Sequence, residues 1–294
     1  MSIPIFPQFN DLDFSMKSDL HPRLSMSEDG ISEFTFAGLY LFRHTYSYRI
    51  SKCEGGCEHL IISGKKDGKN FFMTPCGLPE DDDILIELFN SHDFLKALSE
   101  PNTDKDRVRL EKLGLTAEED RDNFDYLYLK KDLADLPGKK FHKKRNLVSG
   151  FINNYTFEER PLSADRIKDA RSVLETWAAG REVKGDYDAA IESLERMKEL
   201  NLFGYIVYVE GKPAAYTLGE SLAKGRHFVV HFEKALAGYK GIYQFINKAF
   251  AKVLPRHYRY INREQDLGDP GLRQAKMTYR PAGFLKKYRV YPAG

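Results

Sequence analysis

Residues Tyr260 to Phe284 read YINREQDLGDPGLRQAKMTYRPAGF, a short β-like run followed by charged and amide residues and then by a helix-like segment containing Tyr279. If the strand continues to Glu264, its even-numbered residues share one face with Tyr260. Burying so many polar groups without partners or ligands costs free energy. The stretch therefore predicts a binding or catalytic site rather than an ordinary surface loop.

The polar residues here are the main site candidates: Asn262, Arg263, Glu264 and Asp266. Either Glu264 or Glu233, which follows an earlier strand-like run, is the candidate base that takes a proton from an attacking amine. Arg263 is the candidate anchor for a substrate carboxylate or phosphate. A structural network of salt bridges joining the tail to the sheet is the alternative, and the sequence leaves both open.

The preceding residues alternate helices and strands in a regular order. Apolar residues recur at helical spacing in a helix capped by Ser163 and in one capped by Asp186, whereas β-branched and aromatic runs predict strands. The order is helix, helix, hairpin, strand, helix, strand, helix and strand. The ranges outside the two capped helices are a hairpin at 203–209 and 214–218, a strand at 227–232, a helix at 241–254 and a strand at 258–262.

The first half predicts mainly strands separated by glycine-rich turns. A short helix is expected near 11–20 and helical structure over 81–97, where three aspartates favour a helix N-terminus. The segment LTAEED suggests one capped helical turn. The expected strands are 34–42, 46–51, 59–63, 70–74 and 124–129.

Between the halves, residues 136–155 read LPGKKFHKKRNLVSGFINNY and predict a basic amphipathic helix. Mutual repulsion makes such a cluster of cations costly unless an anion offsets it. A solvated surface helix is one interpretation, and an anion-binding helix for phosphate, tRNA or a membrane surface is the other. The candidate contacts are Lys139, Lys140, Lys143, Lys144 and Arg145.

Composition limits the protein class. The 294 residues carry a net charge of +2 and are 42% hydrophobic, which indicates globular domains rather than a disordered chain. Neither a signal-peptide run nor an apolar span of membrane length is present, so we expect a cytoplasmic protein. The cluster Cys53, Cys57 and His59 predicts a hairpin turn rather than a zinc site, because structural zinc takes four ligands. We expect no metal and no required cofactor.

The order of elements from Tyr155 to Tyr291 resembles the GNAT acyltransferase fold. Three segments support the resemblance: VYVEGKPAAYTLG as a strand hairpin, GYKGIYQFI as the phosphate-binding loop and AKMTYRPAGF as the last helix. It implies that Lys240 and Gly241 bind an anion at a helix N-terminus and that Tyr279 protonates the leaving group. Tyr243 departs from the small residue usual in that loop, and its ring would crowd the pyrophosphate of acyl-CoA.

GKKFHKKRN together with YINREQDLGDPGLRQAKMTYRP is similar to the phosphatidylglycerol lysyltransferase C-terminal domain family. The resemblance covers nearly the whole chain and implies an α+β fold of two GNAT-like domains in tandem, each a mixed, mostly antiparallel sheet flanked by helices. The expected division is 1–135, a diverged first domain; 136–155, the basic connecting helix; and 156–294, the domain expected to carry the active site.

The same resemblance implies transfer of an aminoacyl or other acyl group to an amine or hydroxyl, because lipid-modifying members and the related Fem-type transferases use aminoacyl-tRNA. Two alternatives stay open. One is a non-catalytic module that binds tRNA or another polyanion, and the other is an acyl-CoA-dependent N-acetyltransferase. The donor is accordingly either aminoacyl-tRNA or an acyl-CoA.

Overall fold

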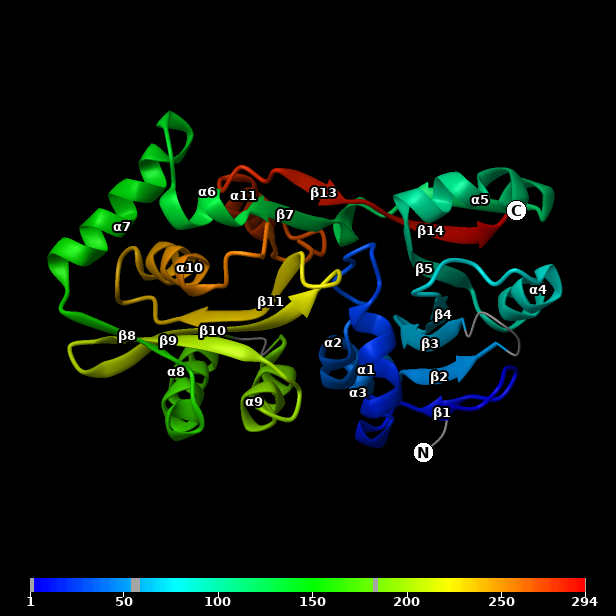
Figure 1. Ribbon diagram of the computed structural model, residues 1–294, viewed down its shortest axis with the longest axis horizontal. Helices are drawn as coiled ribbons and strands as arrows, with labels where there is room; N and C mark the ends of the chain where they lie inside the picture. Colours follow the sequence, from blue (N-terminus) through cyan, green and yellow to red (C-terminus); the bar gives the residue numbers. More distant parts are fainter. Residues whose placement is uncertain (1–2, 54–58, 182–184, 294) are drawn as a thin grey trace. The chain divides into compact units, whose positions relative to one another are not determined.

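A computed structural model describes residues 3–53, 59–181 and 185–293 of the chain (Figure 1). The chain forms two compact units. The first unit comprises Met1–Asp125, Gln265–Asp269 and Phe284–Gly294, and the second comprises Tyr126–Glu264 and Pro270–Gly283. The basic helix falls within the second unit, whereas the end of the chain returns to the first.

Each unit contains a seven-stranded sheet. In the first unit the neighbouring pairs are antiparallel except β4 and β5, which run parallel. The last strand of the chain, β14, lies between β5 and β6, so residues far apart in sequence share one sheet. The strands in sheet order are β1 (Asn10–Asp11), β2 (Arg49–Lys52), β3 (Leu60–Lys66), β4 (Lys69–Met73), β5 (Phe94–Ser99), β14 (Lys287–Pro292) and β6 (Leu115–Glu119).

The helices of the first unit pack on this sheet through a core rich in Phe and Leu. The helices are α1 (Lys17–Ser25), α2 (Phe36–Leu41), α3 (Arg43–Tyr46), α4 (Asp82–Ser91) and α5 (Glu100–Lys112), with short 3-10 turns at Phe14–Met16 and Arg121–Asn123. The strand predicted over 34–42 is wrong. Thr35 caps α2 by accepting a hydrogen bond of 2.9 Å from the Gly38 amide, and this cap decides between a buried helix and a buried strand.

Two further expectations for the first unit are wrong. The helix expected over 81–97 ends at Ser91, and Phe94–Ser99 is a strand instead. The segment LTAEED forms β6 rather than a helical turn. Both strands pair with β14, whose residues come from the far end of the sequence, so local pattern alone does not reveal them.

In the second unit β11 pairs in parallel with β12 and antiparallel with β10. Figure 1 shows α8 and α9 on one face of this sheet and α10 on the other. The strands in sheet order are β13 (Gly283–Leu285), β7 (Asp125–Leu129), β12 (Tyr260–Asn262), β11 (His227–Ala235), β10 (Lys212–Leu222), β9 (Phe203–Val209) and β8 (Phe157–Pro161). The expectation of two mixed sheets flanked by helices is confirmed.

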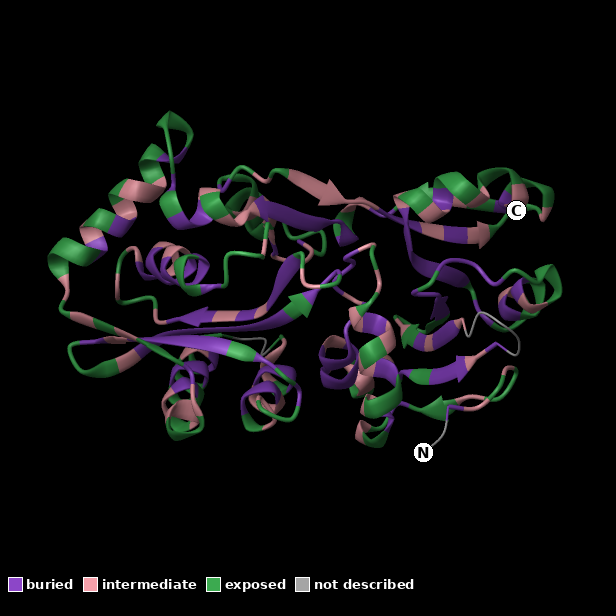
Figure 2. Cartoon of the chain, in the orientation of Figure 1, coloured by how far each residue is buried: buried purple, intermediate pink, exposed green. Residues whose placement is uncertain are grey.

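The second unit also confirms most of the predicted helices, including the basic one. The helices are α6 (Lys130–Asp135), α7 (His142–Asn154), α8 (Ile167–Ala179), α9 (Tyr187–Glu195), α10 (Ile242–Val253) and α11 (Pro270–Met277), with 3-10 turns at Lys139–Phe141 and Ala164–Arg166. Much of the surface of α7 is exposed or half-buried (Figure 2). The helix packs against α10 through Val148 and Phe151.

Two observations concern the membrane-spanning and metal-binding classes that the composition analysis considered. Over the described ranges, no helix combines the length and apolar character needed to cross a membrane. Within the same residues, no group of three or more His, Cys, Asp or Glu side chains is placed to bind a metal ion. Cys57 of the expected hairpin turn lies outside the described residues.

Candidate active site

The candidate site of the second unit forms where β11 and β12 diverge. The two strands pair from His227 with Tyr260 to Val229 with Asn262, after which β12 ends while β11 continues. The strand ends at Asn262, as predicted, and does not continue to Glu264, which has a left-handed backbone with φ of 55°. Beyond this point the side chains of β11 contact residues of β10, of α10 and of the segment after β12.

A β-bulge at His231 aims the polar residues of β11 into this region. On β10, Leu218 pairs with Phe232 and the next residue, Gly219, pairs with Val230, so His231 is the extra residue. A Cβ at Gly219 would collide with the carbonyl oxygen of Val229, and only glycine fits there. Bulges re-aim side chains and are common next to active sites.

His231 is buried between two carboxylates. Its Nδ1 lies 2.7 Å from Glu264 Oε1 and its Nε2 lies 3.0 Å from Glu220 Oε1. Burial alone lowers the pKa of the imidazole, but the hydrogen bonds to Glu220 and Glu264 outweigh that effect and raise the pKa to about 10. The ring is therefore a cation at neutral pH and donates to both carboxylates. Glu264 is held in place yet keeps 27% of its side chain exposed.

Arg263 pairs with Glu233, the other candidate base. Its Nη2 donates to Glu233 Oε1 at 2.7 Å, and the two side chains are 17% and 10% exposed. The second carboxylate oxygen of Glu233 lies 3.5 Å from Asn247 Nδ2 on α10. Glu233 is thus fully engaged, which makes Glu264 the better placed of the two candidates for accepting a proton.

Tyr279 lies directly after α11, with its ring 5.6 Å from the guanidinium carbon of Arg263. The side chains of Gln244 and Arg263 lie close enough to its hydroxyl to lower the pKa of Tyr279. Burial raises the pKa of Tyr279 to about 12, with Arg263 acting in the opposite direction. Tyr279 therefore stays protonated at neutral pH, as a general acid must.

The five basic candidates around α7 do not act together. Lys140 pairs with Asp132 at 2.6 Å, and Arg145 donates to the carbonyl oxygens of Leu136 and Gly138. Lys144 Nζ lies over the Tyr279 ring, 3.9 Å from its centroid. Burial, and secondarily Arg263, lower the pKa of Lys144 to about 8. Lys144 thus belongs to the same group of side chains as Tyr279.

Two of the basic residues remain available to a ligand. Lys139 and Lys143 are exposed, and in the described part of the chain neither has a protein partner. The cationic surface is therefore smaller than the sequence suggests.

The loop before α10 is shaped by α7 and by β11. Gly241 has φ of 91°, and a Cβ there would collide with the carbonyl oxygen of Leu147, so packing against α7 accounts for glycine. Lys240 is exposed. The Tyr243 hydroxyl lies 3.3 Å from both the amide nitrogen and the carbonyl oxygen of Ala235, the last residue of β11. Tyr243 thereby occupies the hydrogen-bonding groups at the strand end.

The remaining two candidates have structural surroundings. Asn262 is fully buried, and its side-chain oxygen accepts from the Glu264 amide at 2.8 Å, which holds the turn that presents Glu264. Asp266 belongs to the first unit, where it is buried beside Arg121 at 3.2 Å and accepts from the Gly268 amide.

Reasoning from sequence missed three members of the group: Glu220, His231 and Gln244. A usable signal existed for His231, because His231 and Glu233 are polar residues two positions apart that follow the apolar run Phe228–Val230 of the same strand. Glu220 reaches His231 through pairing of β10 with β11, which the sequence does not show. Gln244 of α10 could be assigned to the group only once the structure had placed Tyr279, which follows α11.

This fold, with two mixed sheets and diverging parallel strands, is a tandem GNAT-like fold. Residues 25–291 match the family described as Phosphatidylglycerol lysyltransferase, C-terminal, and the chain belongs to that family. A conserved protein of unknown function from Bacteroides thetaiotaomicron is 30% identical, with 97% of this chain and 99% of that chain covered and a TM-score of 0.85.

Two more distant structures share the fold. The C-terminal domain of a putative lysylphosphatidylglycerol synthetase from Agrobacterium fabrum is 16% identical, with 96% and 93% of the two chains covered and a TM-score of 0.66. A tandem GNAT protein from the clavulanic acid biosynthesis pathway is 10% identical, with 98% of each chain covered and a TM-score of 0.53.

Among curated proteins, an uncharacterized protein of Mycoplasmoides gallisepticum is 23% identical over 176 residues. These cover 56% of this chain and 55% of that protein, so the match spans about half the length of each.

Proposed function

We propose that the protein transfers an aminoacyl group from aminoacyl-tRNA to an amine or hydroxyl acceptor. The observation that carries the proposal is that a partly exposed carboxylate, Glu264, lies at the divergence of β11 and β12, while the buried, protonated Tyr279 lies beside the preceding residue, Arg263. The family is that of a lysyl-transferring enzyme, which supports acyl transfer as the reaction class. The acceptor is defined only by its nucleophilic nitrogen or oxygen.

The proposed reaction assigns one role to each group. The acceptor nitrogen or oxygen attacks the ester carbonyl and its proton passes to Glu264, which the His231 imidazolium holds in place. The tetrahedral intermediate then collapses, the ester C–O bond breaks, and Tyr279 gives its proton to the leaving ribose oxygen. Arg263 stabilises the transient tyrosinate. Glu264 then releases its proton to solvent and Tyr279 regains one from solvent, so both groups return to their starting states and no further reactant is needed.

The choice of donor rests on Tyr243. Its hydroxyl already occupies the amide and carbonyl of Ala235 at the end of β11, so an acyl-CoA has no free strand backbone to bind there. Lys139 and Lys143 offer exposed charges to a nucleic-acid phosphate. The acyl-CoA-dependent alternative requires Tyr243 to move, whereas aminoacyl-tRNA does not.

A transfer assay with the Tyr279→Phe variant tests the proposal. The purified chain is mixed with radiolabelled lysyl-tRNA and, separately, with phosphatidylglycerol vesicles or hydroxylamine as acceptor. We expect transfer by the unaltered protein and a loss of about 100-fold for Tyr279→Phe. Tyr258→Phe is the matched control, because Tyr258 packs on Phe228 outside this group of side chains. Activity that survives Tyr279→Phe unchanged removes Tyr279 as the acid.

A non-catalytic tRNA-binding module is the second candidate, favoured by the two exposed lysines alone. Replacing Lys139 and Lys143 with Gln should weaken tRNA binding and reduce the slope of log affinity against log salt by about 1.4–1.8. The control replaces Lys168 and Lys198, two exposed lysines of the same unit. Binding without transfer from any aminoacyl-tRNA would support this candidate, and an unchanged salt slope would exclude Lys139 and Lys143 as contacts.

A further inference from the structure

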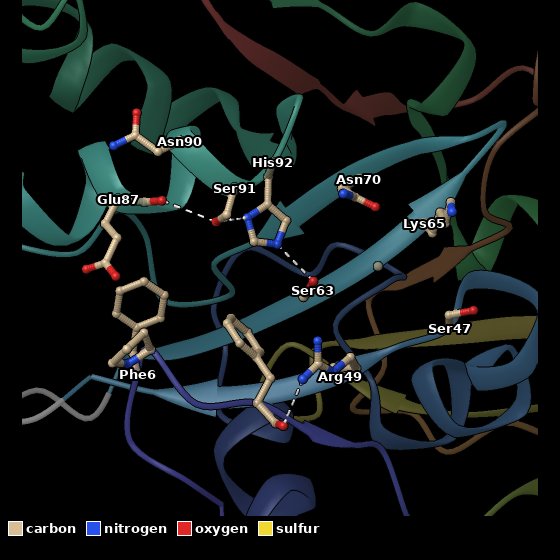
Figure 3. A pocket seen from close by; sticks show the side chains of 13 residues that line it. Phe6, Ser47, Arg49, Ser63, Lys65, Asn70, Glu87, Asn90, Ser91 and His92 are labelled. Atoms are coloured by element: carbon tan, nitrogen blue, oxygen red, sulfur yellow. Dashed lines mark hydrogen bonds between the residues drawn. The ribbon is translucent and has the colours of Figure 1, made fainter.

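The first unit contains a cavity of about 510 Å³, apart from the group of side chains described above (Figure 3). It lies between the N-terminal segment, strands β2 to β4 and the end of α4. Its volume falls within the range of about 300–1,000 Å³ typical of small-molecule sites. The residues that line it are Phe6, Pro7, Phe9, Ser47, Arg49, Ser63, Gly64, Lys65, Asn70, Glu87, Asn90, Ser91 and His92.

His92 and Ser63, which are joined by a hydrogen bond, form one wall of the cavity. His92 Nδ1 lies 2.9 Å from the Leu88 carbonyl oxygen, an acceptor only, so Nδ1 carries a proton. His92 Nε2 lies 2.8 Å from Ser63 Oγ. Burial lowers the pKa of His92, so the ring is neutral and Ser63 donates to Nε2. The lone pairs of the Ser63 oxygen are left to accept from a ligand (Figure 3).

An aromatic surface forms the second wall. The rings of Phe6 and Phe9 meet edge to face with centroids 5.9 Å apart, and the Phe9 ring lies 6.2 Å from that of His92. His92 in turn packs on Phe72 of the core at 5.4 Å. A flat or bulky apolar group fits against such rings, and aromatic contacts with it would stabilise binding.

Charges of opposite sign occupy opposite ends of the cavity. Figure 3 shows Glu87 on the side of Phe6, and Arg49 and Lys65 on the other side. Arg49 donates to the Phe9 carbonyl oxygen at 3.1 Å and lies 3.8 Å from Asp11, so part of its charge is offset. Within the described residues, the side chains of Lys65 and Glu87 are exposed and have no protein partner. These two groups are therefore free to bind the charged ends of a ligand.

We propose that this cavity binds a zwitterion, an amino acid or short peptide with an apolar side chain, a free amino group and a free carboxylate. The ammonium pairs with Glu87, the carboxylate pairs with Lys65, and the side chain packs on Phe6 and Phe9. Ser63 accepts a hydrogen bond from a ligand N–H. The size of the cavity favours a dipeptide over a single amino acid.

Isothermal titration of the full chain tests this site with three probes: the dipeptide phenylalanyl-alanine, the same dipeptide acetylated and amidated at its ends, and free phenylalanine. We expect the uncapped dipeptide to bind at least ten times more tightly than the capped one. Lys65→Gln and Glu87→Gln should each weaken it about 3- to 5-fold, as expected for exposed ion pairs. Phe9→Ala should weaken it about tenfold.

Lys69→Gln is the matched control, because Lys69 is an exposed lysine of the adjoining strand that does not line the cavity. Equal affinity of free phenylalanine and the dipeptide supports the site and assigns it to amino acids. The proposal is overturned if no probe binds at millimolar concentration. It is equally overturned if the capped dipeptide binds as well as the uncapped one, or if Lys65→Gln and Glu87→Gln leave binding unchanged.

Discussion

The imidazole of His231 and the carboxylate of Glu264 are joined by a 2.7 Å hydrogen bond across the gap between β11 and the end of β12. His231 lies at a bulge and Glu264 at a left-handed residue, so both side chains depend on irregular backbone. The contact links the polar face of β11 to the tail. It explains why both departures from regular strand geometry occur side by side.

This contact predicts a pH dependence of stability. The folded-state pKa of His231, about 10, lies above its ordinary value of 6.5, so its stabilising effect is complete below pH 6.5 and is lost as the pH rises through about 10. The free energy of unfolding should fall by a few kcal/mol between these limits. Urea unfolding across pH 6–10 measures it.

The Glu264→Gln variant should show a weaker decline, because it removes one of the two carboxylates that favour the imidazolium. Glu118→Gln, at an exposed carboxylate of β6, is the control. Parallel pH profiles for the unaltered protein and Glu264→Gln would contradict a charged His231.

Gly219 should tolerate no side chain. Because its Cβ would meet the Val229 carbonyl oxygen, Gly219→Ala must displace the backbone at the bulge and should destabilise the protein by about 2–3 kcal/mol. Gly150→Ala in α7 should instead stabilise it by about 0.5–1 kcal/mol, because nothing lies within 4 Å of the added Cβ. Chemical denaturation of both variants measures whether each change lowers or raises the free energy of unfolding. A neutral Gly219→Ala would show that the bulge adapts.

Sequence patterns predicted the second unit better than the first. There, apolar periodicity acts locally, and the order of helices and strands after β8 agrees with the structure, although the Asp186 carboxylate pairs with Lys234 instead of capping α9. In the first unit, β5 and β6 depend on pairing with β14, from more than 150 residues away in sequence. Local preference cannot report a partner that distant.

For the candidate site, the residue types in the sequence indicated the correct segment, Tyr260 to Phe284, but not which particular side chains pair with one another. Arg263 was expected to anchor a ligand or to join a salt-bridge network between the tail and the sheet, and it pairs with Glu233 of β11. After the strand ends at Asn262, the side chain of that residue holds a turn that presents Glu264, and the strand pattern does not predict this turn. Such turns depend on side-chain to backbone bonds that periodicity does not register.

Removing only one partner of the Arg263–Glu233 ion pair should lower the free energy of unfolding. Glu233→Gln leaves a buried guanidinium without its counter-ion and should destabilise the protein by about 3 kcal/mol. It should also lower the pKa of Tyr279 from about 12, because Glu233 contributes to raising it. Thermal unfolding and NMR titration of ring-labelled tyrosine measure the two effects.

Combining Glu233→Gln with Arg263→Met supplies the control. Removing both charges should restore part of the lost stability, because no unpaired ion is left buried. Strictly additive losses would show that the two side chains are not coupled.

Lys144 should react with acylating reagents faster than its neighbours. Its pKa of about 8 leaves roughly half of its amines neutral at pH 8, whereas an ordinary lysine is almost entirely protonated. Brief treatment with an acetyl succinimidyl ester, followed by peptide mass spectrometry, should show about tenfold more modification at Lys144 than at Lys143. Lys143 is an exposed neighbour on the same helix, so its better access to the reagent works against the predicted excess of modification at Lys144.

Replacing Arg263 with Met should reduce the ratio of modification at Lys144 to that at Lys143, because the guanidinium charge helps to lower the Lys144 pKa. Faster labelling of Lys143 would mean that Lys144 is protonated like any surface lysine.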